Sequence, residues 1–305
     1  YDLGGFMLKK IIIGPFVSVS LFIAVFVSMI LYSGYKLWDN NFFNPKIVEY
    51  HYKLDGRDIY SVESRSDFDS FYEKPILLAL HGSQRESENY KTKSVEGENF
   101  YIYQKEKALE NNYRFLSISL DTDVWGNEEG IESLSRLYDY ESENDHYNQH
   151  WLLWATSAGG VNAYRMIGDR PDLFTKMIGT FPVYDTEQMT LVNSRADAYW
   201  DRQYNPADYP EKLSNANFLI FHGLDDNIVD IDLHSGKLKN DMPQNVELIK
   251  TLGGHSTDNF YVYDDEKIND FMFYKIVPKE VLENVPRHSG NYIAVPVVIS
   301  GGEGA

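Results

Sequence analysis

The sequence predicts an α/β protein with a mostly parallel central sheet flanked by helices, and three observations support this prediction. Short apolar runs of strand length alternate along the chain with segments of helical periodicity. Several of these runs, such as 75–82, are continuously apolar, which is typical of strands that are buried on both faces. The 305 residues are also sufficient for one α/β domain with additional segments.

The predicted elements follow one another in an order that fits this architecture. Two alternating stretches at 46–54 and 57–64 are joined by Asp55 and Gly56, a pair typical of a β-hairpin turn. After this antiparallel start, strands and helices alternate, which predicts a series of βαβ units. The predicted strands are 75–82, 113–121, 150–156, 176–183, 216–223 and 245–252, and the predicted helices are 100–111, 131–140, 157–167, 231–240 and 266–277.

The composition of the segments divides the chain into five parts. These are an N-terminal flank (1–10), an apolar segment (11–32), a linker (33–45), an α/β domain (46–285) and a weakly structured tail (286–305). Within the domain, residues 185–213 lack clear strand character although they lie between two predicted strands. A connection of this length is usually functional, so we expect a small cap over a site.

Residues 11–32 form an uncharged apolar run of 22 residues. As a helix this run would extend roughly 33 Å, enough to cross a hydrocarbon core of about 30 Å. It is longer than the apolar part of a typical signal peptide, so it predicts an uncleaved, single-pass anchor in the lipid bilayer, with a cleaved signal peptide as the alternative. Lys9 and Lys10 favour an N-terminus inside the cell, which places the α/β domain outside the cytoplasm.

Charge and cysteine content exclude several classes of function. The chain has 46 acidic and 28 basic side chains, a formal net charge of −18, and such a field repels nucleic acids. It contains no cysteine, which excludes disulfides, thiolate metal sites and cysteine nucleophiles.

Ser157 stands where a predicted strand changes into a predicted helix. Ala155 and Gly159, two positions before and after it, are small enough to allow a sharp strand-to-helix turn, which would leave the serine hydroxyl exposed above the sheet. The N–H of Ala158, at the positive end of the following helix, is then predicted to stabilise an oxyanion. The alternative is that Ser157 simply caps this helix.

A nucleophilic serine requires a histidine to take its proton and a carboxylate to hold that histidine. Asp225 and Asp226 lie in the loop after the strand 216–223, and His255 lies in the loop after the last predicted strand. The chain order of serine, acid and histidine is that of the α/β-hydrolase fold, so Ser157, Asp226 and His255 are the predicted catalytic triad.

Two further regions are predicted to border this site. The first parallel strand ends in His81-Gly82-Ser83, where Ser83 is expected to supply the second oxyanion N–H, with Gln84 as the alternative donor and a substrate contact. Residues 121–132 have nearly the acidic spacing of a calcium loop, but the fifth position is Trp125 and a strand precedes them. We therefore predict no metal site, and Trp125 is expected to contact substrate instead.

Three segments resemble the α/β-hydrolase superfamily, namely 74–83, 155–183 and 217–229. They are most similar to feruloyl esterases, to polyhydroxybutyrate-depolymerase-like esterases and to the catalytic domain of prolyl-oligopeptidase-type peptidases. The His-Gly-x-x-Asp pattern of these families, counted from His222, assigns the acid to Asp226 instead of Asp225. Ala155 departs from the pattern, because it stands where the families have a glycine.

The function that these observations predict is a membrane-anchored serine hydrolase. It would cleave carboxylic esters of a small-molecule or acylated substrate through an acyl-enzyme intermediate, with no metal or organic cofactor. A serine peptidase or an acyltransferase with the same triad is the alternative within this class. The alternative from another class is a non-catalytic, membrane-tethered binding module with a hydrolase fold.

Overall fold

The computed structural model describes most of the predicted α/β domain. The described residues are 27–29, 46–65, 73–91, 99–121, 124–143, 147, 150–189, 204–255 and 263–273. The predicted flank, linker and tail lie outside them, as does the predicted anchor at 11–32 except for 27–29. Among the residues that are described, no helix is both long and apolar enough to span a membrane. The fold below belongs to one compact unit, Val48–Ser64 and Ser70–Ala305.

The described part of the domain is built on an eight-stranded sheet in the order β1-β2-β4-β3-β5-β6-β7-β8. Strands β3 to β8 are parallel to one another, and β2 pairs antiparallel with β4. The predicted turn between β1 and β2 is present, with positive φ angles at Asp55 (49°) and Gly56 (84°), as a two-residue hairpin requires. The strands are β1 (Lys46–Leu54), β2 (Arg57–Arg65), β3 (Ile76–Leu80), β4 (Arg114–Ile118), β5 (Leu152–Thr156), β6 (Lys176–Thr180), β7 (Asn217–Gly223) and β8 (Val246–Thr251).

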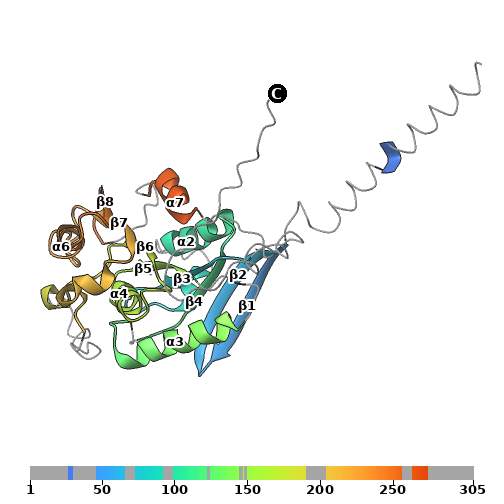
Figure 1. Cartoon of the computed structure of the whole chain (residues 1–305), viewed down its shortest axis with the longest axis horizontal. Helices are drawn as coiled ribbons and strands as arrows, with labels where there is room; N and C mark the ends of the chain where they lie inside the picture. Colours follow the sequence, from blue (N-terminus) through green and yellow to red (C-terminus); the bar gives the residue numbers. More distant parts are fainter. Residues whose placement is uncertain are drawn as a thin grey trace, which may run out of the picture. The chain divides into compact units, whose positions relative to one another are not determined.

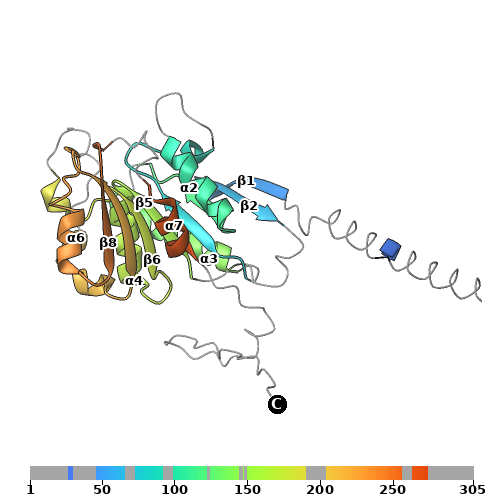
Figure 2. The same ribbon diagram turned by 90° about the horizontal axis from the view of Figure 1, so that it is seen from above.

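Helices cover both faces of the sheet (Figure 1, Figure 2). Residues of α3, α4 and α6 pack in the larger apolar cluster on one face, and residues of α2 and α7 pack in a second cluster on the other. All five residues of β3 and of β5 are buried for this reason, and the predicted α/β class is confirmed. The helices are α2 (Asn99–Glu110), α3 (Glu128–Ser142), α4 (Gly159–Asp169), α6 (Ser235–Asp241) and α7 (Asp265–Met272), with short 3-10 turns η2 (Ser87–Tyr90), η3 (Thr186–Gln188), η4 (Pro206–Asp208) and η5 (Pro210–Leu213).

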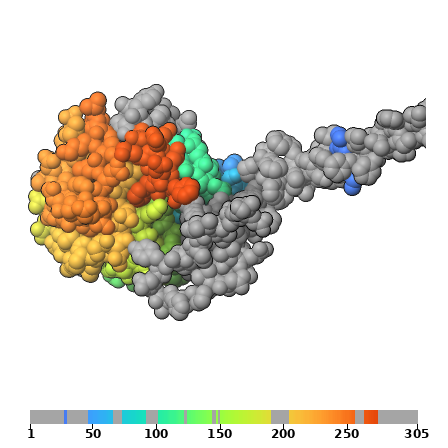
Figure 3. All heavy atoms as spheres, turned by 45° about the horizontal axis from the view of Figure 1, so that its top comes forward, coloured from blue at the N-terminus to red at the C-terminus, as the bar shows by residue number. Residues whose placement is uncertain are grey.

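Helix α7 lies beside β8 at the surface. Lys267 of α7 forms an ion pair with Glu247 of β8, and Figure 3 shows the two segments as adjacent red and orange regions. This contact joins the last described helix to the last strand of the sheet.

Several predicted elements have different limits in the structure, and two of these differences have a clear local cause. The strand predicted at 176–183 ends at Thr180, because Phe181 has a φ of 37° and turns the chain out of the sheet. The helix predicted at 231–240 begins only at Ser235, because the Asp230 carboxylate accepts two backbone N–H groups in a preceding turn.

A buried ion pair joins the start of β4 to the end of α3. Arg114 donates two hydrogen bonds to Glu141, at 2.6 and 3.0 Å, and the two residues are 6% and 4% exposed. Arg114 Nε also donates to Ser61 Oγ at 2.7 Å, and the guanidinium lies 4.5 Å from the ring centre of Tyr147. A two-point arginine–carboxylate contact of this kind is specific in geometry, so it fixes α3 against the sheet.

We expect Arg114→Ala to lower the free energy of unfolding by about 3–5 kcal/mol, because Glu141 would remain as a buried and unpaired charge. Arg136→Ala is the control, since Arg136 pairs with Asp55 and Glu132 through side chains that are 46–59% exposed. Exposed pairs of this kind contribute at most about 1 kcal/mol. Urea unfolding of the two variants measures the difference, and equal losses would contradict this account of Arg114.

Candidate active site

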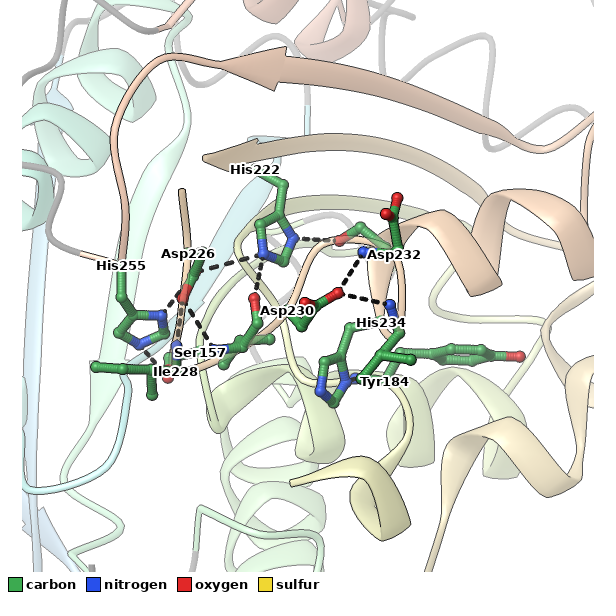
Figure 4. A network of polar contacts seen from close by, with 12 residues as sticks. Ser157, Tyr184, His222, Asp226, Ile228, Asp230, Asp232, His234 and His255 are labelled. Carbon is green, nitrogen blue, oxygen red and sulfur yellow. Dashed lines mark hydrogen bonds and ion pairs between the residues drawn. The ribbon is translucent and has the colours of Figure 1, made fainter. Parts of the chain in front are cut away.

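The predicted site residues lie at the carboxyl ends of the parallel strands. Ser157 follows β5, Asp226 follows β7 and His255 follows β8 by four residues. The carboxyl ends of parallel strands share one edge of a sheet, where α/β proteins commonly place their sites. Figure 4 shows the three side chains pointing toward one another.

The three side chains form a chain of hydrogen bonds. His255 Nε2 lies 3.0 Å from Ser157 Oγ, and His255 Nδ1 lies 2.9 Å from Asp226 Oδ2. An ionised carboxylate only accepts hydrogen bonds, so Nδ1 of a neutral His255 carries the hydrogen and donates it to Asp226. The lone pair of Nε2 is then directed at the serine hydroxyl, as removal of its proton requires.

Ser157 occupies a strained turn between β5 and α4. Its φ is 50°, in the left-handed region that residues other than glycine rarely adopt. Three backbone hydrogen bonds hold it there: its N–H donates to Thr180 O at 3.1 Å, and its carbonyl accepts from Gly160 N and Val183 N at 3.0 and 2.9 Å. Ala155, at the position of the missing glycine, is fully buried within β5.

The turn also requires glycine where α4 begins. A Cβ on Gly159 would lie 2.5 Å from Leu80 O and 2.6 Å from His81 O, both backbone atoms of the neighbouring strand and its loop. A Cβ on Gly160 would lie 2.7 Å from Pro182 Cβ. These distances are too short for real contacts, so the close approach of α4 to the sheet accounts for both glycines.

The Asp226 carboxylate is fully buried and fully hydrogen-bonded. Its Oδ1 accepts from Ile228 N and Val229 N at 3.0 and 2.9 Å, and its Oδ2 lies 3.4 Å from His222 Nε2 in addition to the His255 contact. Burial acts to raise the pKa of Asp226, but the hydrogen bonds from His222, His255 and Val229 hold it well below its usual range. Asp226 is therefore ionised at neutral pH.

Backbone contacts join the loop that carries the acid to the loop that carries the histidine. Leu224 N donates to Thr251 O at 2.9 Å, and Asp225 N donates to Gly253 O at 2.9 Å. The Asp225 side chain is exposed, and Asp226 is the one that contacts His255. The geometry thus agrees with the choice of Asp226 over Asp225.

Phe181 is a site residue that the sequence did not predict. Its ring lies 4.3 Å from the His255 ring, centre to centre, and its N–H donates to Phe221 O at 2.8 Å. The packing limits rotation of the imidazole. Nothing in the sequence around Phe181 indicates this contact, because it depends on the positive φ that turns the residue out of β6.

The loop after β3 lies against Ser157. A Cβ on Gly82 would lie 3.3 Å from Ser157 Cβ. His81 Nε2 accepts from Leu120 N at 3.0 Å, so the neutral ring carries its hydrogen on Nδ1 and donates it to Gly82 O at 2.8 Å. Burial lowers the pKa of His81 to about 4, so the ring is neutral at neutral pH. Since the C=O and N–H of one trans peptide point in opposite directions, this bond also fixes the direction of the Ser83 N–H.

The two predicted oxyanion donors have no acceptor within the described ranges. The N–H groups of Ala158 and Ser83 make no hydrogen bond there, although Ala158 is fully buried. Tyr101, which the sequence did not point to, supports the loop because its hydroxyl accepts from Gly82 N at 3.1 Å. Gln84 is exposed, with a φ of 61°, and its predicted substrate contact stays a prediction.

The loop that begins at residue 121, whose acidic spacing is close to that of a calcium loop, contacts α4. Gly126 N donates to Asn162 Oδ1 at 2.7 Å, Gly126 O accepts from Arg165 at 2.6 Å, and the Asn127 side chain caps α3. In the described part of the chain, no group of three or more acidic, histidine or cysteine side chains could hold a metal ion. Trp125 is 5% exposed and packs in the larger apolar cluster, and its predicted substrate contact stays a prediction.

The predicted cap at 185–213 is described only at its two ends. Asn205 joins these ends, because its Oδ1 accepts from Thr186 N at 2.9 Å and its Nδ2 donates to Asp185 Oδ1 at 3.2 Å. Lys237 of α6 forms an ion pair with Asp185 at 2.7 Å. Residues 190–203, the middle of the predicted cap, lie outside the described residues.

The strand order, the serine at the β5–α4 turn and the helices on both faces define an α/β-hydrolase fold. Solved structures share this fold. Est1E from Butyrivibrio proteoclasticus superposes with a TM-score of 0.56 at 16% identity, over 73% of this chain and 97% of Est1E. An S-formylglutathione hydrolase from Staphylococcus aureus superposes with a TM-score of 0.55 at 14% identity, over 75% of this chain and 95% of the hydrolase. The Pyrococcus furiosus esterase Pf2001 superposes with a TM-score of 0.53 at 14% identity, over 77% of this chain and 94% of the esterase. No protein-family model and no curated protein matches the sequence.

A matched pair of glycines in α4 tests the close approach of this helix to the sheet. We expect Gly159→Ala to lower the free energy of unfolding by about 1–3 kcal/mol, because backbone must move to make room for the new Cβ. Gly168→Ala is the control, since its Cβ would lie 3.4 Å from Lys212 Cβ, an ordinary contact, and alanine favours the helix by up to about 1 kcal/mol. Thermal and urea unfolding of both variants would refute the explanation if Gly159→Ala were the more stable of the two.

The low pKa of Asp226 predicts a pH-dependent contribution to stability. A carboxyl whose pKa is lower in the folded than in the unfolded state stabilises the fold above its unfolded pKa, and this stabilisation is lost as the pH falls toward the folded pKa. Asp226→Asn should therefore be less stable than wild type at pH 7, and the gap should shrink from about pH 5 downward. Urea unfolding between pH 3 and 7 measures the gap, and a constant difference would contradict the shifted pKa.

Proposed function

We propose that this chain is a serine hydrolase that cleaves carboxylic esters, with Ser157 as nucleophile, His255 as general base and acid, and Asp226 as the group that orients His255. The observation that carries the proposal is the continuous hydrogen-bond chain from Ser157 Oγ to His255 and on to Asp226, at 3.0 and 2.9 Å. A serine that merely caps α4 would require neither the imidazole nor the ionised acid behind it.

The geometry supports a two-stage reaction. His255 Nε2 takes the proton of Ser157 while Oγ attacks the acyl carbon, and the resulting oxyanion accepts hydrogen bonds from Ala158 N–H and Ser83 N–H. His255 then gives that proton to the leaving alcohol as the ester C–O bond breaks, which leaves the acyl group on Ser157. A water molecule, deprotonated by the same imidazole, attacks this acyl-enzyme and releases the carboxylic acid and the free serine.

Two of the structural neighbours support ester chemistry. Pf2001 is an esterase, and Est1E has been solved with ferulic acid bound. Both neighbours are covered almost completely, so a domain of this size is sufficient for the whole of each protein. We infer a small-molecule or acylated substrate for this chain.

The proposal includes a membrane anchor. Residues 11–32 have the length and the uncharged composition of a single membrane-spanning helix, and Lys9 and Lys10 favour a hydrolase domain outside the cytoplasm. Fractionation of cells that express the full chain tests this part separately: the chain should sediment with membranes and resist extraction at high pH, and a freely soluble full chain would contradict it.

Labelling with a fluorophosphonate probe tests the nucleophile. Wild-type protein should be labelled and should hydrolyse p-nitrophenyl esters, whereas Ser157→Ala should lose labelling and at least about 10³-fold in kcat. Ser214→Ala, which alters an exposed serine remote in sequence from the triad, should behave as wild type. Labelling that persists in Ser157→Ala, or its absence from wild type, would contradict the proposal.

Substrate panels then separate ester from peptide hydrolysis. We expect p-nitrophenyl and feruloyl esters to be cleaved with higher kcat/KM than p-nitroanilide peptides. A preference for the peptides would replace the esterase by a peptidase with the same triad.

A further inference from the structure

His222 is a second buried histidine that contacts the carboxylate of the proposed triad. It is the penultimate residue of β7 and is fully buried. Its Nε2 lies 2.7 Å from Val229 O and 3.4 Å from Asp226 Oδ2, and its Nδ1 lies 2.6 Å from Ser235 Oγ (Figure 4). The reaction described above makes no use of this imidazole.

The surroundings of His222 determine where its hydrogen lies. Its Nε2 faces two oxygens, the Val229 carbonyl and the ionised Asp226, that can only accept hydrogen bonds, so Nε2 must carry a hydrogen. In the neutral ring the lone pair is then on Nδ1, and the Ser235 hydroxyl donates to it. Val229 O and Asp226 therefore select the form of His222 whose Nε2 carries the hydrogen, and the Ser235 hydroxyl, at the start of α6, satisfies its Nδ1.

His222 Nε2 donates its hydrogen to Val229 O at 2.7 Å, and the same N–H lies beside Asp226 Oδ2, with Nε2 at 3.4 Å from it. Backbone N–H groups occupy Asp226 Oδ1, whereas Oδ2 receives only the two imidazoles. A donor on Oδ2 withdraws negative charge from the oxygen that His255 contacts, and it also opposes rotation of the carboxylate. The other ionisable groups in this corner are Asp230, His234 and Asp185, and burial lowers the pKa of His234 to about 4, so its ring is uncharged at neutral pH.

We propose that His222 is a positioning residue that acts through Asp226: it fixes the carboxylate toward His255 and limits how strongly the carboxylate attracts the proton of His255. This inference rests on the proposed serine-hydrolase function. It assigns His222 a role in the acid–base step in addition to its place in the fold.

The test compares the pH dependence of kcat/KM for a p-nitrophenyl ester in wild type, His222→Leu and His222→Gln. The acid limb of this profile reports the ionisation of His255 in the free enzyme. Without the donor, Asp226 Oδ2 attracts the proton on His255 more strongly, so the midpoint in His222→Leu should rise by about half a pH unit or more, with a loss of about tenfold in kcat. Glutamine places an amide N–H near the position of Nε2, so His222→Gln should restore the midpoint.

His234→Leu is the matched control, because it removes another buried imidazole that contacts the N–H groups of Tyr184 and Asp185 but not Asp226. It should lose stability but keep the wild-type midpoint. Ser235→Ala provides a second approach if His222→Leu does not fold: losing the donor to Nδ1 should raise the midpoint in the same direction, by less.

The outcomes separate the inference from the function on which it rests. A wild type without Ser157-dependent turnover would overturn both. Normal wild-type turnover combined with an unshifted midpoint in His222→Leu and Ser235→Ala would overturn the role of His222 alone. A shift of equal size in His234→Leu would also overturn it, because the effect would then follow from the loss of any buried histidine in this region.

Discussion

The site depends on the close contact between the first turn of α4 and the end of β3. Gly159 lies so near Leu80 O and His81 O that no side chain fits between helix and sheet. The same contact forces Ser157 into the left-handed region and brings Gly82 within reach of it. The strain at Ser157 and the position of the loop after β3 thus have one cause, which is the steric closeness of a helix to the strand beside it.

Two buried carboxylates of the domain, those of Glu141 and Asp226, are stabilised in different ways. Where β4 meets α3, Arg114 neutralises the charge of Glu141 through two hydrogen bonds. At the site, no lysine or arginine among the described residues pairs with Asp226. Backbone N–H groups and two imidazoles lie against the carboxylate instead, and its pKa stays well below the usual range.

Local sequence patterns predicted the strands, the helices and the residues that follow the strand ends, because apolar periodicity and small residues act over a few positions. Contacts between separate loops could not be predicted in this way. Phe181 reaches His255 only because its φ is positive, and Tyr101 reaches Gly82 from another helix. The sequence could not show which ring nitrogen of His81 or of His222 donates, since that depends on acceptors from other parts of the chain.

Main-chain hydrogen bonds join the loop after β7, which carries Asp226, to the end of β8 and the loop after it, which carries His255. They run from Leu224 N to Thr251 O and from Asp225 N to Gly253 O. The side chains of Leu224 and Leu252 on these loops are consequently 49% and 84% exposed, and the alignment of Asp226 with His255 does not rely on them. Mutation can alter the apolar surface of these two loops while Asp226 and His255 keep their alignment. A lineage with this domain could therefore vary the side chains that both loops expose without disturbing the residues of the proposed triad.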